Sequence, residues 1–406
     1  MKSTRLIAYM LLIALTFVMI IHVSVRVQLN ITSEGNVRSQ ATPPRANHAA
    51  SGWMHRRGEN LNRLRQRFSC YPAGDVNYKI RGAALEEVLV AQWAHNLGYP
   101  RNWTIVDVGI NKGWTVVKLL DALGVGKRNL ARMMAAHLFD FAERHFPELD
   151  FYARSLLCHD CTNVVSPVAS SPVGAGAVVF GYDGQSSYVL HFLNFTKQLL
   201  SSSAVFSVVV KHLALSNRTS IGSFYTEGFG TETSSLTGSA IYGTGFSEMV
   251  SITTIDRELG GSVPHVDILV TDTEGHDLHV LEGASDFLSN GRVSLYVLEL
   301  HKSDKQLSDS LSFLLEKGYF CVIPVRKVTE PTKMYLLFAL SPPCRGTDGA
   351  RGWSNAICVN LNDTELVDAL LEVSMHNVTD SLSTFDEVLP GVCASWIRSN
   401  GSCIPS

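Results

Sequence analysis

The sequence lacks an excess of charge of either sign. Its 406 residues include 34 Lys and Arg against 37 Asp and Glu, which gives a formal net charge of −3. A protein that binds nucleic acid normally carries a strongly basic face, so this balance argues against a general nucleic-acid binder. No internal repeat stands out. The length allows one large domain with appendages or two domains, and an apolar fraction of 46% is ample for a core.

Only one long apolar run is present, "LIAYMLLIALTFVMIIHVSV" at residues 6–25. It is about long enough to cross a bilayer as a helix. No small-residue cleavage site follows it, which favours a retained signal anchor over a cleaved signal peptide. Lys2 and Arg5 precede the run and favour a cytoplasmic tail of residues 1–5. We therefore expect a single-pass type II membrane protein of the Golgi or endoplasmic reticulum, with its body in the lumen.

Two further features agree with a luminal body. Seven N-x-S/T triplets are potential glycosylation sites; they begin at Asn30, Asn102, Asn194, Asn217, Asn362, Asn377 and Asn400. Eight cysteines form an even set, which in an oxidising compartment predicts disulfides; they are Cys70, Cys158, Cys161, Cys321, Cys344, Cys358, Cys393 and Cys403. The "CHDC" stretch resembles half of a zinc site, but no second pair follows at suitable spacing, so disulfides are favoured over zinc.

Composition divides the rest of the chain into three parts. Residues 26–69, with "SQATPPRANHAASG", resemble a flexible stem, although "ENLNRLRQRF" near its end is typical of a short helix. The main folded domain is expected over residues 70–343. Residues 344–406 hold four cysteines and three acceptor triplets, which predicts a disulfide-braced C-terminal extension.

Short Val/Ile/Leu runs alternate with segments of helical spacing in the main domain. The runs are "WTIVDVG", "GAVVFGYDG", "FSVVVKHLAL", "VDILVTD" and "LYVLELH". Helices are expected at 114–123, 129–146, 187–200, 278–288 and 306–317. This alternation predicts an α/β fold with a parallel sheet covered by helices on both faces.

A glycine-containing turn follows the first of these strands. In "TIVDVGINKG" the spacing is D-x-G-x-N-x-G, with Asp107, Gly109, Asn111 and Gly113. Glycines let the backbone turn tightly and approach a ligand closely. The spacing differs from the dinucleotide G-x-G-x-x-G and from the phosphate-binding G-x-x-x-x-G-K-[ST]. The acid ahead of the turn disfavours a pyrophosphate and suits a ligand that carries an ammonium or sulfonium charge.

Acids also follow two later strands. Asp183 ends "VVFGYDG", where it either accepts hydrogen bonds from a ribose diol or caps a turn. "DILVTDTEGHDLHVLEGA" places Asp272, Glu274 and Asp277 at the mouth of a buried strand. Like charges that close repel, so solvent, a cation or a ligand that needs acids must offset them.

The order of these segments over residues 103–323 resembles the FkbM-type methyltransferase family. The segments are "IVDVGINKGWTVV", "VVFGYDG", "HLALSNRTSIGSFYTEGFGTETSSLTG", "SITTIDREL", "VDILVTDTEGHDLHVLEGA" and "LYVLELHK". The most specific is D-x-E-G-x-[DE] followed by "VLEGA". The resemblance implies a Rossmann-like class I fold, S-adenosylmethionine as cofactor and O-methylation of sugars or other hydroxylated metabolites. The chain departs from the family at "YDG", where an acid followed by proline is common.

The resemblance also implies roles for individual residues. The cofactor-binding set is Asp107, Gly109, Asn111, Gly113 and Asp183, and the catalytic set is His301, Glu274, Asp272 and Glu299. Because transfer to a hydroxyl is helped by a general base, His301 is the first candidate, and Glu299 is expected to orient it or to meet substrate. Asp277 is expected at the start of the next helix. No metal is expected, with a divalent cation on Asp272 and Glu274 as the alternative.

The sequence therefore predicts a membrane-anchored luminal O-methyltransferase that acts on a glycan or glycoconjugate. Two alternatives come from other classes of protein. One is a metal-dependent glycosyltransferase that uses Asp272 and Glu274. The other is a catalytically silent binding protein with the same fold.

Overall fold

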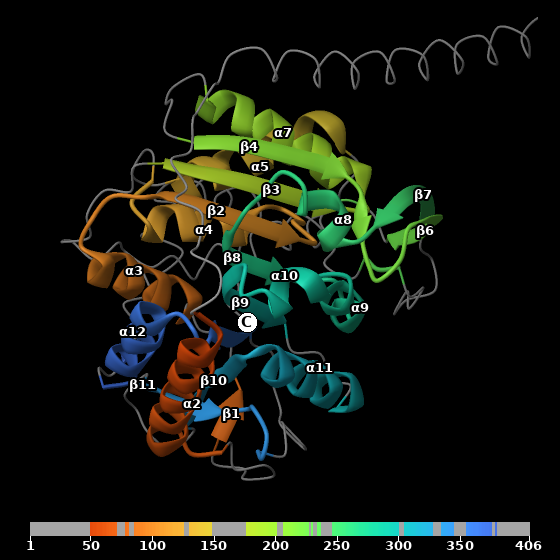
Figure 1. The fold of residues 1–406 in the computed structure, drawn as a ribbon. Helices are drawn as coiled ribbons and strands as arrows, with labels where there is room; N and C mark the ends of the chain where they lie inside the picture. The colour runs from red at the N-terminus through yellow and green to blue at the C-terminus, as the bar shows by residue number, and fades with distance from the viewer. Residues whose placement is uncertain are drawn as a thin grey trace, which may run out of the picture. The chain divides into compact units, whose positions relative to one another are not determined.

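The structure is a computed structural model. It describes residues 49–70, 78–80, 85–125, 130–147, 176–200, 206–226, 229, 234–236, 246–299, 304–327, 334–344, 355–375 and 378–379. Residues Ser51–Ser406 form one compact unit, and Met1–Ala50 form another. The fold below is that of the larger unit (Figure 1).

A large mixed sheet organises this unit. Its strand order is β13-β11-β10-β12-β9-β8-β2-β3-β4, with β1 paired to β10 beside this path. One half of the sheet is parallel, and consists of β4 (Phe206–His212), β3 (Gly176–Asp183), β2 (Asn102–Val108), β8 (Val266–Thr271) and β9 (Val293–Glu299). The sequence predicted these strands and their alternation with helices, and the mixed α/β fold confirms that prediction.

The other half of the sheet is antiparallel. It contains β12 (Asn355–Asn360), β10 (Tyr319–Lys327), β11 (Met334–Ala339), β1 (Tyr78–Ile80) and β13 (Val378–Thr379). β12 lies between β9 and β10 and pairs with both. Residues 355–360 are therefore an interior strand of the sheet. The boundary expected between the main domain (residues 70–343) and a C-terminal extension (residues 344–406) thus falls inside the folded unit.

Helices cover both faces of the sheet, as the apolar runs predicted. On one face lie α2 (Ala49–Arg67), α3 (Leu85–Leu97), α4 (Trp114–Ala122), α5 (Leu130–His145), α7 (Ser186–Leu200) and α12 (Thr364–Met375). On the other face lie α8 (Ile255–Leu259), α9 (Asp277–Glu282), α10 (Ser285–Ser289) and α11 (Asp304–Lys317). Along β2 the side chains of Trp103 and Ile105 join the first core, and those of Val106 and Val108 join the second.

Two predicted elements are divided in the structure. The helix expected over 278–288 is interrupted at Gly283, where a Cβ atom would lie 1.9 Å from the backbone oxygen of Ser216. The strand expected over "FSVVVKHLAL" ends at His212 and resumes as β5 (Ala214–Leu215), which belongs to a separate three-stranded sheet. That small sheet also contains β6 (Ser220–Thr226) and β7 (Phe246–Thr253) (Figure 1).

The helix α2 belongs to the folded unit rather than to a stem. Its Leu64 is fully buried, and Asn60 donates a hydrogen bond to the backbone oxygen of Leu361 at 2.9 Å. Arg57 donates to the backbone oxygen of Leu315 at 2.7 Å. The predicted helix "ENLNRLRQRF" is thus confirmed, and the expected stem of residues 26–69 ends in packed structure.

Two disulfides lie within the described residues. Cys70 pairs with Cys344, and Cys321 of β10 pairs with Cys358 of the adjacent β12. These four cysteines are consequently not thiolate ligands for zinc. The remaining four cysteines lie outside the described residues.

The predicted membrane span at residues 6–25 also lies outside the described residues. Among the helices that the structure describes, none is both long enough and apolar enough to cross a bilayer.

Candidate active site

A cavity with about 520 Å³ of unfilled space lies at the carboxyl ends of β2, β3 and β8. Because these strands are parallel neighbours, the segments that follow them meet at one edge of the sheet. The cavity is lined by residues from these segments and from the small sheet: Val108, Gly109, Asn111, Tyr182, Asp183, Gly184, Tyr188, Leu213, Ala214, Leu215, Phe224, Ser234, Leu236, Asp272, Thr273, Glu274 and His276.

The turn after β2 requires its first glycine. Gly109 has φ +82°, and a Cβ atom there would lie 1.8 Å from the backbone oxygen of Asp272. The amides of Gly109 and Ile110 both donate to the backbone oxygen of Tyr182, at 2.9 and 3.1 Å. The turn is therefore held between β3 and β8. Asn111 also has a positive φ, +48°, a conformation that non-glycine residues rarely adopt and that is common at functional sites.

Asp183 fixes this turn to the end of β3. One carboxylate oxygen accepts a hydrogen bond from the amide of Asn111 at 2.8 Å, and the other accepts from the amide of Gln185 at 2.7 Å. Burial raises the pKa of Asp183 to about 6, although both hydrogen bonds lower it. The turn-capping alternative for Asp183 is therefore present in the structure. Asp183 also lines the cavity, so the predicted contact with a ribose remains a prediction.

Two residues of the predicted cofactor-binding set do not line the cavity. Asp107 is only 2% exposed, and burial, together with the nearby Asp272 and Asp183, raises its pKa well above the ordinary range. Gly113, at φ +84°, packs against Phe192, whose ring would lie 2.3 Å from an added Cβ atom. Both residues therefore belong to the packing around the turn and not to the wall of the cavity.

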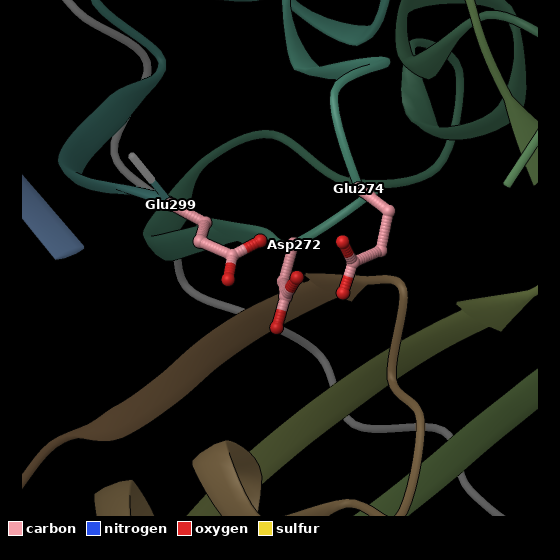
Figure 2. Close-up of side chains that lie close together, drawn as sticks. All are labelled: Asp272, Glu274 and Glu299. Atoms are coloured by element: carbon pink, nitrogen blue, oxygen red, sulfur yellow. The ribbon is translucent and has the colours of Figure 1, made fainter. Parts of the chain in front are cut away.

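Three predicted carboxylates converge at the ends of β8 and β9. Asp272, Glu274 and Glu299 each offer an oxygen, and these atoms all lie within 4.8 Å of one another (Figure 2). Glu299 is 6% exposed, whereas Asp272 and Glu274 are half-buried and border the cavity. Glu274 has φ +53°, so its backbone is held in the left-handed region beside Gly275.

Three charges at this separation repel strongly, so the cluster is stable only if protons, a cation or a bound positive group offset them. Oxygen ligands in this arrangement suit a hard divalent cation. They equally suit proton exchange with a hydroxyl, since coupled carboxylates share protons. The geometry thus supports both the catalytic role predicted for these residues and the metal alternative.

The structure does not describe His301, the predicted general base, which lies outside the described residues. It does place His276 at the cavity, a residue that the sequence analysis did not single out. His276 is 9% exposed and lines the cavity, and its Nε2 lies 2.9 Å from the hydroxyl of Ser216. Burial, with smaller contributions from His279 and Arg218, lowers the pKa of His276 to about 4, so the ring is neutral at neutral pH. Its place inside "TEGHD" was the signal that could have identified it.

Aromatic and aliphatic side chains form the rest of the wall. Tyr188 of α7 and Phe224 of β6 supply rings, and Leu215 and Leu236 supply aliphatic groups. Residues 234–236, which the structure describes, precede β7. There the hydroxyl of Ser234 donates to Gln185 at 2.9 Å, so this segment is tied to the site.

Asp277 lies at the first position of α9, as predicted, and is 5% exposed.

Two solved methyltransferase structures show distant similarity to the chain. The methyltransferase FkbM from Methylobacillus flagellatus KT has 10% sequence identity and a TM-score of 0.32, over 64% of this chain and 43% of that one. The chain thus spans less than half the length of that protein. The precorrin-6y C5,15-methyltransferase from Geobacter metallireducens GS-15 has 10% identity and a TM-score of 0.26, over 67% of this chain and 88% of that one. No curated protein matches the chain significantly.

The family comparison is more specific. A family model matches residues 147–321, a region that begins after the glycine turn of residues 107–113. The region includes Asp183, Asp272, Glu274 and Glu299. The match supports a methyltransferase domain of the kind that the order of motifs suggested. Residues 147–321 of the chain match the model of the methyltransferase FkbM domain.

Proposed function

We propose that this chain is an S-adenosylmethionine-dependent O-methyltransferase that acts on a hydroxyl of a glycan or glycoconjugate. One observation carries the proposal: a single cavity joins the glycine turn after β2 to the carboxylates that follow β3 and β8. The FkbM domain match over residues 147–321 agrees with it.

The lining of the cavity suits this cofactor in charge and in the kinds of side chain present. S-adenosylmethionine carries a positive sulfonium and a positive ammonium group, and Asp183, Asp272 and Glu274 supply negative charge around the cavity. Gly109 and Asn111 line the cavity, so the turn itself borders the space that a ligand would occupy. The rings of Tyr188 and Phe224 provide an apolar wall that suits a purine.

The cofactor would supply a methyl group on a sulfonium centre. The chain must then orient a hydroxyl in line with that group and remove its proton. Asp272 and Glu274 border the cavity and can accept the proton, and Glu299 stands behind them within the same cluster. His276, neutral at neutral pH, offers a further hydrogen-bonding group from the adjacent wall. His301 remains the proposed base on the strength of the family resemblance.

The placement of the protein is part of the proposal. An apolar run at residues 6–25 and seven acceptor triplets support a type II protein of the Golgi or endoplasmic reticulum, anchored by its N-terminal helix. Enzymes that modify glycans in the secretory route share this layout, which favours a glycan as the acceptor by analogy.

Calorimetric titration of the full chain with S-adenosylmethionine and with its demethylated product tests the proposal. We expect Kd values in the micromolar range and a loss of at least tenfold in Asp272→Asn. Asp286→Asn is the matched control, because it removes the same charge from an exposed residue of α10. A folded sample that binds neither compound, but binds UDP- or GDP-sugars with manganese, would instead support a glycosyltransferase.

Transfer itself is measured with a cofactor labelled in its methyl group. Oligosaccharides with different terminal residues serve as acceptors, and the label must appear in base-stable linkage on the sugar. Label that is lost in mild base would mark an ester, and would contradict transfer to a hydroxyl.

A further inference from the structure

A second cleft lies at the opposite edge of the sheet, with about 880 Å³ of unfilled space. Its walls come from residues that precede the parallel strands, such as Tyr99 and Arg101 before β2 and His265 before β8, together with Ser294 at the start of β9. None of its lining residues lines the candidate active site. The seven residues of β2 separate the two sites by roughly 23 Å at 3.3 Å per residue. This cleft therefore requires an explanation of its own.

One wall of the cleft is apolar. Trp93 and Leu97 lie one turn apart on α3 and face the cleft together. Tyr99 follows the turn at Gly98, where φ is +68°, and its side chain is left 55% exposed at the rim. The wall therefore ends in a flat ring that is open to a ligand.

The opposite wall is polar and rigidly organised. Arg101 is paired with Asp267, and its guanidinium lies 4.7 Å from the ring centroid of Trp103. His265 Nε2 lies 3.1 Å from the hydroxyl of Ser294, which donates to Asp363 at 2.7 Å. These contacts hold the polar groups in place before any ligand arrives, which lowers the entropic cost of binding.

The charges of the cleft are largely balanced. Arg56 and Arg101 carry positive charge, and they are matched by the lining carboxylates of Asp363 and Glu365. The buried Asp267, which is paired with Arg101, adds a third carboxylate. Burial lowers the pKa of His265, which favours its neutral form. A cleft with no surplus cation is poorly suited to a phosphate or sulfate. It offers instead neutral or compensated donors and acceptors.

Asn362 adds a carboxamide to the polar wall. Its side-chain oxygen is buried and has no hydrogen-bond partner within the described residues, so it meets a ligand only when the side chain turns towards the cleft. The backbone N–H of Asn362 donates a hydrogen bond to the side-chain oxygen of Asn360 at 3.0 Å, which holds this part of the backbone in place. A ligand rich in hydroxyl groups would complement such a wall.

We propose that this cleft binds a neutral saccharide, with a sugar ring against Tyr99 and its hydroxyls towards Arg101 and Asn362. A pyranose has an apolar face of C–H groups and an edge of hydroxyls, which matches one aromatic and one polar wall. The site is distinct from the candidate active site, and it stands whether or not the chain transfers methyl groups. In an enzyme that acts on glycans, it would hold a part of the acceptor remote from the reacting hydroxyl.

Saturation-transfer NMR and titration with three probes test this proposal: methyl β-D-galactoside, methyl α-D-mannoside and N,N′-diacetylchitobiose. The full chain is produced without N-linked glycans, because Asn362 begins an acceptor triplet beside the cleft. We expect at least one probe to bind. Tyr99→Ala should weaken binding about tenfold, the effect of losing one well-placed ring contact, and Tyr99→Phe should retain it.

Two controls make the result specific. Ile221→Ala changes an exposed apolar residue outside the cleft and should leave saccharide binding unchanged. Binding of S-adenosylmethionine should be unaffected in Tyr99→Ala, so a failure of the active-site proposal is distinguished from a failure of this one. Absence of binding by all three probes at millimolar concentration would overturn the proposal. So would equal binding by Tyr99→Ala, or Tyr99-dependent binding of inorganic sulfate in place of a sugar.

Discussion

Replacement of Gly109 by Ala tests whether the turn after β2 is held as tightly as the structure indicates. An L-residue in the left-handed region costs about 1–2 kcal/mol. The new Cβ atom would also lie 1.8 Å from the backbone oxygen of Asp272, and neither backbone can move freely. The amide of Asp272 donates to Val108 at 2.9 Å, and the amide of Gly109 donates to Tyr182 at 2.9 Å. Relief of such a clash typically costs a further ~1–3 kcal/mol.

We therefore expect Gly109→Ala to lower the free energy of unfolding by about 2–5 kcal/mol, measured by urea denaturation. Gly98→Ala is the matched control, because Gly98 also has a positive φ, +68°, but no atom lies within 4 Å of an added Cβ atom there. Gly98→Ala should therefore show the cost of the left-handed backbone alone, without a clash. The difference between the two variants measures the clash. Equal destabilisation by both would refute the close packing of the turn on β8.

Three other expectations concern the rest of the fold. Burial, reinforced by Glu86, raises the pKa of Glu87 from 4.5 to about 8. The folded state then holds this proton more tightly than the unfolded chain, so the stability of the fold falls as pH rises between these values. Glu87→Gln should reduce that fall, measured by thermal melts from pH 5 to 8. Asp267→Asn leaves Arg101 without its charged partner, and should cost about 2 kcal/mol in urea denaturation, because partial exposure of Arg101 moderates the penalty of a buried pair. Replacement of both Cys321 and Cys358 by Ala removes a disulfide that links residues 37 positions apart, and should lower the free energy of unfolding by about 3–4 kcal/mol in the same measurement. An unchanged free energy of unfolding would show that the disulfide does not form.

Most of the parallel half of the sheet was predictable because its strands, apart from the edge strand β4, are largely buried on both faces. Ile105, Ile268 and Leu295 lie in register across β2, β8 and β9, and each comes from a continuous apolar run. The acids after these strands could be placed at one edge of the sheet for the same reason, since parallel strands present their carboxyl ends together. This reasoning placed Asp272 and Glu274 there, and the family resemblance added Glu299. The structure brings an oxygen of each within 4.8 Å of the others.

The antiparallel half could not be predicted, since it depends on pairing between distant segments. The short run "NAICVN" of β12 does not indicate that it lies between β9 and β10, and its position next to cysteines and acceptor triplets suggested an extension. The break at Gly283 likewise depends on a contact with Ser216, a residue distant in sequence. Asp183 lines the cavity, but its hydrogen bond from the amide of Asn111 depends on the turn after β2, which its own sequence segment does not reveal.

The interior position of β12 also bears on how the protein is made. A ribosome releases β9 and β10 before residues 355–360. Until those residues emerge, the edge of β9 that faces β12, and the Tyr319–Val322 part of β10, have no strand partner. Unpaired strand edges are prone to association with other chains. The last strand to join these two is thus an interior one, and the nascent chain exposes strand edges inside its future sheet until β12 has been made.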